Sequence, residues 1–376
     1  MSALDEVQAH AATLAGLAGM TPVRLAKVLD GFDPVVAFHA VRSGTHPGDP
    51  RRRFRTSARE SDPQEVGRRY ERAGVAVLLR DRSGYPSRLI GDPGAPAVLF
   101  GLGDPCILEG RPRVAIVGTR SATSYGRQVA SELAAELSAH GVTVVSGLAM
   151  GIDAAAHAGV VLGGGEGAAP PVAVVGTGLD VIYPATNRDL WEQVARRGAV
   201  LAESPLGTQA RPGVFPARNR IIAALSDIVV VVESHLRGGS LYTAEAAARR
   251  SIPVCAVPGS VRSPSSAGTN SLLVDGCTPV RDATDVLVAL GLAYAGSSDQ
   301  HGLPVGRGSS RPGQCREDVG RTPSQRAVLA AVEFEPTALE TILLRTDLSI
   351  AEAATACDEL VESGSLVSGP GWWAQV

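Results

Sequence analysis

The sequence predicts an α/β protein built around a Rossmann-like, doubly wound and mostly parallel sheet. From Arg113 onward, short apolar segments alternate with helical segments, which is typical of parallel βα units. The composition agrees with this fold class, because 44% of the residues are hydrophobic and only 4% are aromatic. A core of Ala, Val, Leu and Ile suits strands that are buried on both faces.

Six segments have the composition of such buried strands. Helical stretches separate them, and the clearest of these, 124–141, has a Val/Leu face and ends at a glycine. The predicted strands lie in 113–120 (RVAIVGTR), 142–147 (VTVVSG), 171–178 (PVAVVGTG), 198–203 (GAVLAE), 227–234 (DIVVVVES) and 253–259 (PVCAVPG).

Residues 1–45 are expected to form a small helical domain of the sterile-α-motif or helix-hairpin-helix kind. Apolar residues recur there at near-helical spacing, and residues 14–32 faintly resemble a helix-hairpin-helix, a module that often grips a DNA backbone. A plain packing role for these helices stays open. Residues 46–110 are expected to be a basic connector and a lead-in to the core, and 42–60 (RSGTHPGDPRRRFRTSARE) has the composition of an exposed basic segment.

The core is expected over 111–293, followed by a flexible Gly/Ser/Pro-rich linker over 294–323. Residues 324–376 predict three helices and a terminal hairpin, which suggests a winged helix. No Lys or Arg follows Arg345, and the predicted third helix is acidic. Because phosphates repel an acidic surface, we expect this module not to bind DNA.

The sequence gives no sign of a membrane span, a leader or a cofactor. No segment approaches the roughly 20 uncharged apolar residues of a transmembrane helix. The acidic start MSALDEVQAH lacks the basic region of a signal peptide. Five cysteines are scattered without a CxxC pair, which is typical of free thiols in a reducing compartment. We therefore expect a cytoplasmic protein with no metal and no other cofactor.

The loops after the predicted strands contain glycine, hydroxyl and arginine residues. In a parallel sheet these loops meet at one edge, where free amides of helix starts can bind phosphate. Arg120 lies in the first loop and Ser240 in a later one, so an anion-binding rim is expected. Each glycine taken alone is also consistent with a tight turn. A dinucleotide is not expected, because GTRSATSYG is not GxGxxG and no acidic residue ends the second strand.

The segment FPARNRIIAALS carries the most specific signal. Arg218 and Arg220 flank Asn219 at the start of a predicted helix, where their donors can converge on phosphates. Phe215 could stack on an unpaired base. In the alternative interpretation, the two arginines pair with acidic residues such as Glu203 or Glu233, and Phe215 belongs to the core.

Together these motifs strongly resemble the DNA-processing protein A (DprA, or Smf) family over about 113–280. The resemblance rests on GTRSATSYG, VVSGLAMGIDAAAH, VAVVGTGLDVIYPATN, FPARNRIIAALSDIVVVVES, GGSLYTAEAA and SAGTNSLLVDG. It implies a homodimer that binds single-stranded DNA, protects incoming DNA and loads a RecA-type recombinase during natural transformation. Single-strand-binding protein is a further candidate partner, and no enzymatic activity is implied.

The resemblance also implies which residues contact DNA. Arg120, Phe215, Arg218 and Arg220 would line the DNA pocket, with Asn219 between the two arginines. Members of the family often carry a basic residue just before the FP motif, and Arg211 is the candidate for that position. Hydroxyls and amides would come from Ser121, Gly147, Gly239 and Ser240.

The alternative function is that of a Rossmann-like nucleoside-monophosphate phosphoribohydrolase, a class with a similar layout. Its signature, PGGxGTxxE, includes a glutamate that assists cleavage of the N-glycosidic bond. Here RGGSLYT lacks the second glycine-threonine step, and Glu245 follows Thr243 at a spacing of two residues rather than three. His157 is the one histidine to weigh, and a structural role between helix and loop is expected for it.

The segment 285–295 (DVLVALGLAYA) bears on dimerisation. Leu287 and Leu290 lie in an apolar stretch that follows the predicted sheet. This stretch either packs on the sheet or contributes to an interface, and the family resemblance favours an interface nearby.

Overall fold

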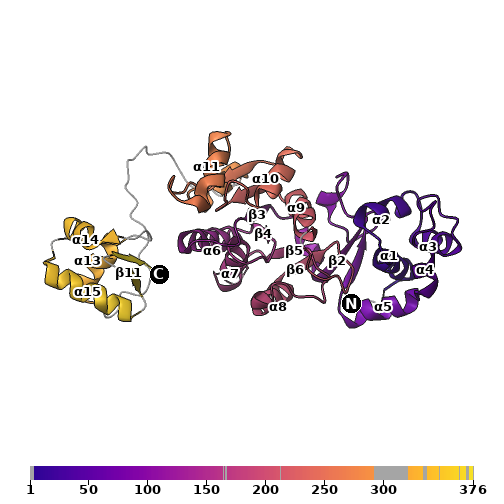
Figure 1. Ribbon diagram of the computed structural model, residues 1–376, viewed down its shortest axis with the longest axis horizontal. Coiled ribbons are helices and arrows are strands. Elements are labelled where there is room, and N and C mark those ends of the chain that lie inside the picture. The colour runs from indigo at the N-terminus through magenta and orange to yellow at the C-terminus, as the bar shows by residue number, and fades with distance from the viewer. Residues whose placement is uncertain are drawn as a thin grey trace, which may run out of the picture. The chain divides into compact units, whose positions relative to one another are not determined.

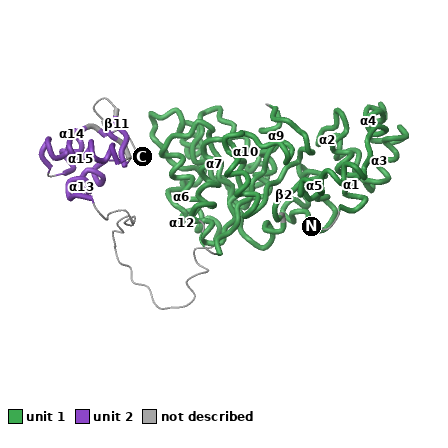
Figure 2. Tube along the Cα trace, turned by 90° about the horizontal axis from the view of Figure 1, so that it is seen from below, with its two compact units in different colours: residues 1–298 green, residues 299–376 purple. Residues whose placement is uncertain are grey.

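The computed structural model describes residues 4–163, 165, 167–211, 213–291, 321–332, 337–346, 348–363, 365–369 and 372–375. The chain divides into two compact units, Met1–Ser298 and Asp299–Val376, which are coloured separately in Figure 2 and are described one by one. Most of the linker expected over 294–323 lies outside the described residues.

Within the described part of the first unit, nine strands form one sheet in the order β1-β2-β6-β5-β4-β3-β7-β8-β9. The six predicted strands are confirmed, and β3 lies between β4 and β7. The chain therefore builds outward from β3 to β6 and then resumes at β7 on the other side of β3. The bounds are β1 Ala76–Leu79, β2 Val98–Gly103, β3 Arg113–Val117, β4 Thr143–Ser146, β5 Val172–Val175, β6 Ala199–Ala202, β7 Ile228–Val231, β8 Val254–Ala256 and β9 Thr278–Pro279.

Helices cover both faces of this sheet (Figure 1). On one face, α6, α7 and α12 pack on the outward side chains of β3, β4 and β7. On the opposite face, α9 and α10 pack against each other and against the same strands. The bounds are α6 Ser124–Ala139, α7 Ile152–Gly163, α8 Arg188–Arg197, α9 Val214–Leu225, α10 Leu241–Ala248, α11 Ala267–Val274 and α12 Ala283–Ala289. The doubly wound architecture predicted from the sequence is confirmed.

The helices expected over 1–45 are present, but the region that follows them differs from the expected connector. Five helices precede the sheet: α1 Glu6–Gly16, α2 Pro22–Leu29, α3 Pro34–Ser43, α4 Arg55–Glu60 and α5 Pro63–Arg72. The connector expected over 46–110 instead contains α4 and α5 and the antiparallel strands β1 and β2, which extend the sheet beyond β6. Its arginine-rich composition hides a few apolar residues that the fold buries, Phe54, Ala58 and Tyr70 among them.

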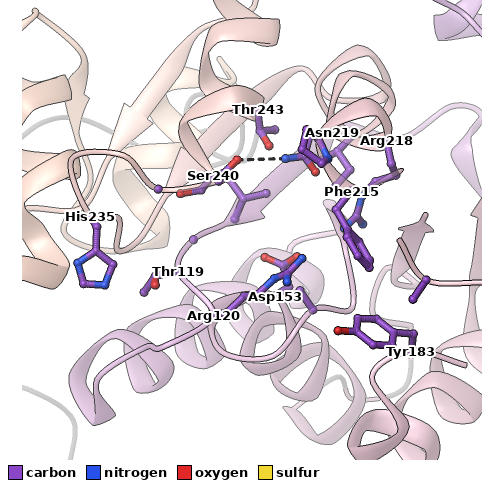
Figure 3. Close-up of a pocket in the computed structure, with 18 of the residues that line it drawn as sticks. Thr119, Arg120, Asp153, Tyr183, Phe215, Arg218, Asn219, His235, Ser240 and Thr243 are labelled. Atoms are coloured by element: carbon purple, nitrogen blue, oxygen red, sulfur yellow. Dashed lines mark hydrogen bonds between the residues drawn. The ribbon is translucent and has the colours of Figure 1, made fainter. Parts of the chain in front are cut away.

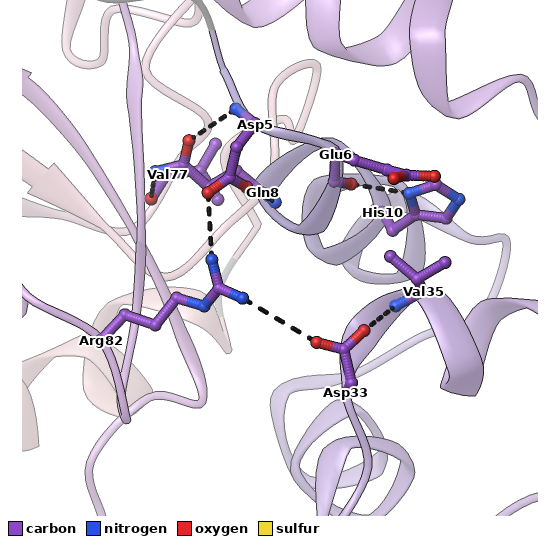
Figure 4. Close-up of polar contacts among 8 residues, drawn as sticks. All are labelled: Asp5, Glu6, Gln8, His10, Asp33, Val35, Val77 and Arg82. Atoms are coloured by element: carbon purple, nitrogen blue, oxygen red, sulfur yellow. Dashed lines mark hydrogen bonds and ion pairs between the residues drawn. The ribbon is translucent and has the colours of Figure 1, made fainter.

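Polar contacts connect this helical region to the edge of the sheet, and two of the residues involved also cap helices (Figure 4). Asp5 caps α1 and Asp33 caps α3, and both carboxylates also reach the guanidinium of Arg82, at 3.0 and 3.9 Å. Gln8 donates from its amide to the carbonyl oxygen of Val77 in β1, at 3.0 Å. The helices also share an apolar cluster with β1, β2, β5 and β6. The first 298 residues are therefore one compact unit rather than a core with a separate helical domain.

The second unit contains the predicted three helices and terminal hairpin. They are α13 Pro323–Ala331, α14 Leu339–Arg345, α15 Ile350–Glu362, β11 Leu366–Gly369 and β12 Trp372–Gln375. Ser349 and Glu352 form a capping box at the start of α15. Helix α14 begins at Leu339, and the two residues before it, Thr337 and Ala338, form β10 and pair with β12. The assignment as a winged helix stays a prediction.

The structure also bears on two other expectations, the lack of a membrane span and the formation of a dimer. No helix among the described residues is long and apolar enough to cross a bilayer. In α12, Val286 is fully buried, and Leu287 lies half-buried against the cluster under α6, as does Leu290 just after the helix. Packing on the core thus accounts for both leucines. Dimerisation stays a prediction.

His157 in α7 is fully buried. Neither of its ring nitrogens has a hydrogen-bond partner among the residues that the structure describes. Burial lowers the pKa of His157 from 6.5 to about 3, so the ring is neutral in the folded protein at neutral pH. The unfolded chain takes up this proton near its ordinary pKa. Stability is therefore lost as the pH falls below about 6.5 toward 3.

We predict that His157→Leu reduces the acid sensitivity of folding. Between pH 7 and pH 5 the unmodified protein should lose about 2 kcal/mol more of its unfolding free energy than the variant, at about 1.4 kcal/mol per unit of pKa difference. Urea unfolding at both pH values measures this difference. His39→Gln, on the exposed side of α3, is the control and should follow the unmodified protein. Equal pH dependence of His157→Leu and the unmodified protein would contradict the prediction.

Candidate nucleic-acid interface

A cavity of about 640 Å³ opens at the carboxyl ends of the central parallel strands (Figure 3). Its walls come from the loop after β3, the start of α7, the loop after β5, the first turns of α9 and the loop between β7 and α10. This is the place where the strand order reverses on either side of β3. Open α/β sheets bind ligands at such a point because loop amides and helix starts converge there.

Seven of the ten residues expected at the site line this cavity. They are Arg120, Arg211, Phe215, Arg218, Asn219, Gly239 and Ser240. The cavity also brings in residues for which the sequence suggested no role: Thr119, Asp153, Tyr183, His235 and Thr243. Ser121, Gly147 and Arg220 do not line it.

An arginine and two aromatic rings form a stack at the cavity. The guanidinium carbon of Arg120 lies 4.7 Å from the centre of the Phe215 ring. The Phe215 ring also contacts Tyr183: the centres of the two rings are 5.3 Å apart, and their planes make an angle of 35°. Tyr183 is 43% exposed and Arg120 is exposed, so the stack is open to a ligand. Flat, partly exposed rings beside a cation are suited to unpaired bases and their phosphates.

The sequence did not identify Tyr183 as a residue of the site. It lies in the loop after β5, 32 residues before Phe215, and nothing local shows that the two rings meet. The only available signal is its place in VIYPATN, at the carboxyl end of a predicted parallel strand. That placement puts its side chain on the same rim as the other loops.

Arg218 lies at the base of the cavity and is only 6% exposed. One terminal nitrogen donates to the carbonyl oxygen of Val174 in β5, and its Nε has no partner among the described residues. The structure thus gives Arg218 no ion pair with Glu203, one of the partners considered in the alternative interpretation. Burial lowers the pKa of Arg218 to about 10, an effect that the charge of Asp153 opposes. The guanidinium is nonetheless charged at neutral pH.

Asp153, in the first turn of α7, is the other buried charge at the cavity and is 7% exposed. Burial raises its pKa, and the positive charges of Arg218 and Arg120 oppose that rise. Asp153 is the only carboxylate among the described residues that line the cavity. The cavity therefore combines Arg120, Arg211 and Arg218 with a single, largely enclosed acid.

Gly147 serves the site in a different way from the one expected. We expected it to offer a backbone amide, but it is buried after β4 and lines only a small adjoining hollow, together with Arg120, Phe215 and Arg218. A Cβ at this position would lie 2.2 Å from Nη1 of Arg218 and 2.5 Å from Oδ2 of Asp153. The glycine is needed because both buried charges press against its Cα.

Arg220 and Ser121 are directed elsewhere. Arg220 pairs with Glu203 at 2.7 Å in a half-buried contact, as the alternative interpretation held for this residue. Ser121 is exposed, and its amide donates to the Thr119 hydroxyl at 3.2 Å. Neither residue is placed to contact a ligand in the cavity without a rearrangement, so a DNA contact for them stays a prediction.

Hydrogen bonds fix the glycine loop on the α10 side of the cavity. Asn219 donates from its amide to the carbonyl oxygen of Gly239 at 3.2 Å. Ser240 donates to the hydroxyl of Ser234 at 2.9 Å, and both serines are buried. Asn219 and Ser240 therefore hold the loop as much as they face the cavity.

A second cavity of about 610 Å³ adjoins the first. It lies between the turn from α1 to α2 and the loop after β6, and Arg211 and Arg218 line both cavities. The hairpin that faintly resembled a helix-hairpin-helix thus faces this second cavity. Arg211 is exposed and marks the passage between the two.

The glutamate that the phosphoribohydrolase alternative requires does not lie in the cavity. Glu245 is exposed on α10 and pairs with Arg249 one turn later, at 2.5 Å. It lines a separate apolar hollow between α10 and α11. A glutamate at this position cannot reach a nucleotide held beside Phe215 without a rearrangement of α10.

Comparison with known sequences identifies relatives of this chain. A family model described as DNA recombination-mediator protein A matches residues 76–291. Protein Smf from Synechocystis is 34% identical over 333 residues, which are 82% of this chain and 82% of that protein. DNA processing protein DprA from Bacillus subtilis is 36% identical over 221 residues, 59% of this chain and 73% of its own.

Solved structures of the same kind share the fold. DNA processing protein A from Streptococcus pneumoniae matches with a TM-score of 0.65 at 31% identity, covering 76% of this chain and 98% of that one. The protein of the same name from Helicobacter pylori, whose structure is described for its single-stranded DNA binding mode, matches with a TM-score of 0.50 at 30% identity. That match covers 57% of this chain and 95% of the other.

We predict that Gly147→Ala damages both the fold and the site. The added methyl group must displace Arg218 or Asp153, and overpacking of this kind costs about 1–3 kcal/mol of unfolding free energy. Gly16→Ala is the matched control, because no atom lies within 4 Å of a Cβ at that position. Urea unfolding of both variants measures the difference. An unchanged unfolding free energy for Gly147→Ala would show that the buried charges move aside freely.

Proposed function

The chain belongs to the DNA recombination-mediator protein A family, and we propose that it binds single-stranded DNA in the cavity beside β3 and β7. The observation that carries this proposal is the stack of Arg120, Phe215 and Tyr183 above the buried cation Arg218. Rings for bases and cations for phosphates are the two elements that single-strand binding requires.

The stack favours unpaired bases. A base in a duplex has both faces covered by its neighbours, whereas a base in a single strand can place one face on Phe215 or Tyr183. Every base has such a face, so this contact tolerates any sequence. Within the described lining, Asn219 is the one amide side chain that could read a base edge, and it is already bonded to Gly239. Binding without sequence preference follows.

The arginines give the cavity its attraction for phosphate. Arg120 and Arg211 are exposed and take part in no ion pair among the described residues, so both are available to a backbone. Arg218 contributes a fixed charge from below, in surroundings where water screens it weakly. We propose that the strand runs from the stack across Arg211 into the second cavity, because Arg211 lines both.

The wider role follows from the family. We propose that the chain, acting as a homodimer, protects incoming single strands and passes them to a RecA-type recombinase during natural transformation in the cytoplasm. Single-strand-binding protein would be a further partner. Stimulation of strand exchange by a RecA-type recombinase, on DNA already covered by single-strand-binding protein, tests this role directly.

We also propose that the chain is a binding protein and not a phosphoribohydrolase. The position of Glu245 outside the cavity supports this, since hydrolysis of the N-glycosidic bond needs a carboxylate beside the sugar. Incubation with AMP should release no adenine above the level of a protein-free control, as measured by chromatography. Release of adenine that is abolished by Glu245→Gln would establish the enzyme instead.

For the binding site itself, we predict that Phe215→Ala weakens oligothymidylate binding by roughly 10-fold, since a base–aromatic stack contributes about 1–3 kcal/mol. Phe215→Tyr should retain most of the affinity.

Arg120→Ala should weaken binding to every sequence alike and make the salt dependence shallower by about 0.7 in log–log slope, the share of one phosphate contact. Fluorescence anisotropy at several salt concentrations measures both effects.

Arg196→Ala on the exposed side of α8 removes the same charge away from the cavity and is the control. It should bind like the unmodified protein. If Phe215→Ala and Arg120→Ala both bind oligothymidylate as the control does, the cavity is not the single-strand site.

A further inference from the structure

A cluster of six arginines lies outside the cavity, on the N-terminal helices. It comprises Arg42, Arg51, Arg52, Arg53, Arg55 and Arg59, which we call the α3–α4 cluster. All are exposed except Arg55, which is half-buried, and none lines either cavity. Both Figure 1 and Figure 2 place α2 between this cluster and α9. The cluster is therefore a surface separate from the site described above.

Ion pairing distinguishes these arginines from their neighbours. Among the described residues, no member of the cluster forms an ion pair with a carboxylate. On the next helix, α5, Arg68 and Arg72 both pair with Glu65, and Arg69 pairs with Asp180. The arginines of α5 thus each contact a carboxylate, whereas those of the α3–α4 cluster have none among the described residues and leave a positive surface.

The local fold brings the cluster together. Helix α3 ends at Gly44 in a left-handed conformation, and the side chains of Arg52 and Arg55 both pass within 3.2 Å of the position that a Cβ of Gly44 would take. Arg55 and Arg59 are one turn apart on α4 and share a face. Arg42 lies in the last turn of α3, two residues before Gly44.

Hydrogen bonds to a buried carboxylate hold the turn that carries these arginines, and one residue of the turn has an unfavourable backbone conformation. The Asp49 carboxylate, only 4% exposed, accepts from the amides of Arg53 and Phe54 at 2.9 and 3.1 Å. Arg52 has a φ of 53°, a left-handed conformation that favours glycine and costs an arginine of order 1 kcal/mol.

The chemistry of the cluster fits phosphates and offers nothing to bases. Phe54, the aromatic residue between Arg53 and Arg55, is 3% exposed and belongs to the core. The nearby acids do not cancel the charge, because Asp49 is enclosed in the turn and Glu60 is a single exposed carboxylate beside Arg59. Without a stacking ring, the surface must act through charge alone. Such a surface prefers the partner with the densest row of phosphates.

We propose that the α3–α4 cluster binds the backbone of duplex DNA. A duplex carries one negative charge per about 1.7 Å of its axis, about twice the density of one strand. The protein would then hold a single strand in the cavity and a duplex on its N-terminal helices at the same time. This inference does not depend on the cavity's ligand, since the two surfaces share no residue.

The test is the triple variant Arg51→Ala/Arg53→Ala/Arg59→Ala in the full chain, which removes exposed members and leaves the two arginines packed over Gly44. Its control is Arg68→Ala/Arg72→Ala/Arg249→Ala, which removes the same charge from paired, exposed positions. Binding of a blunt duplex and of oligothymidylate is measured for each by anisotropy over a range of salt. Circular dichroism checks that the helices are intact.

The cluster variant should lose roughly 10-fold or more in duplex affinity at moderate salt and bind oligothymidylate within about 3-fold. Its salt slope for duplex should be shallower by about 2.7, or 0.9 for each of three phosphate contacts. Arg51→Lys/Arg53→Lys/Arg59→Lys should restore most of the affinity, because a phosphate contact needs the charge rather than the guanidinium shape. The control should match the unmodified protein on both ligands.

Three outcomes would overturn the proposal. Equal losses on duplex and oligothymidylate would make the cluster part of the single-strand path. Unchanged binding of both ligands, or an unmodified protein that does not bind duplex at all, would assign the arginines to the stability of α3 and α4 or to an acidic protein partner. Arg120→Ala separates the two proposals: if it leaves oligothymidylate binding intact while the triple variant loses duplex, the cavity proposal fails and this one stands.

Discussion

The burial of the Arg218 guanidinium behind the carboxyl ends of the parallel strands is the constraint on which the site depends. Removing a charge from water costs free energy that its surroundings must offset. The carbonyl oxygen of Val174 and the charge of Asp153 offset part of it, and Gly147 leaves the space that both charges need. A phosphate in the cavity would add negative charge where the interior lacks it. If the cavity binds phosphate as proposed, ligand binding and stability are linked at this point.

Helix α9 carries both the buried cation and the stacking ring, so the position of one fixes the position of the other. Phe215 and Arg218 are three residues apart on α9 and so share a face, which places the ring at the opening and the cation at the base. Arg120 from the loop after β3 and Tyr183 from the loop after β5 then complete the stack on Phe215. A shift of α9 would move the cation and the stacking surface together, so the cavity behaves as a unit rather than as a set of separate contacts.

The sequence revealed the parallel strands because each is buried on both faces and is a continuous apolar run. Residues 75–79 (VAVLL) and 97–100 (AVLF) are continuous apolar runs as well, but the surrounding arginines led to the prediction of a connector, so β1, β2, α4 and α5 were not predicted. Arg218 and Arg220 are equivalent in the sequence, two residues apart. Only the direction of α9 decides that the first faces the cavity and the second faces Glu203. The contact of Tyr183 with Phe215 is a tertiary fact that local spacing could not contain.

Arginine content alone says little about this chain, because every basic residue except Lys27 is an arginine and the formal net charge is −3. Ion pairing separates the structural arginines from the available ones. Arg113, Arg220 and Arg250 are half-buried and hold segments of the core together through Asp227, Glu203 and Asp92. Arg120, Arg211 and the exposed members of the α3–α4 cluster have no carboxylate partner among the residues that the structure describes. A mildly acidic protein thereby keeps two local positive surfaces, one with rings and one without. If both surfaces bind DNA as proposed, that difference decides which form each can hold, because rings need unpaired bases and bare charge needs only phosphates.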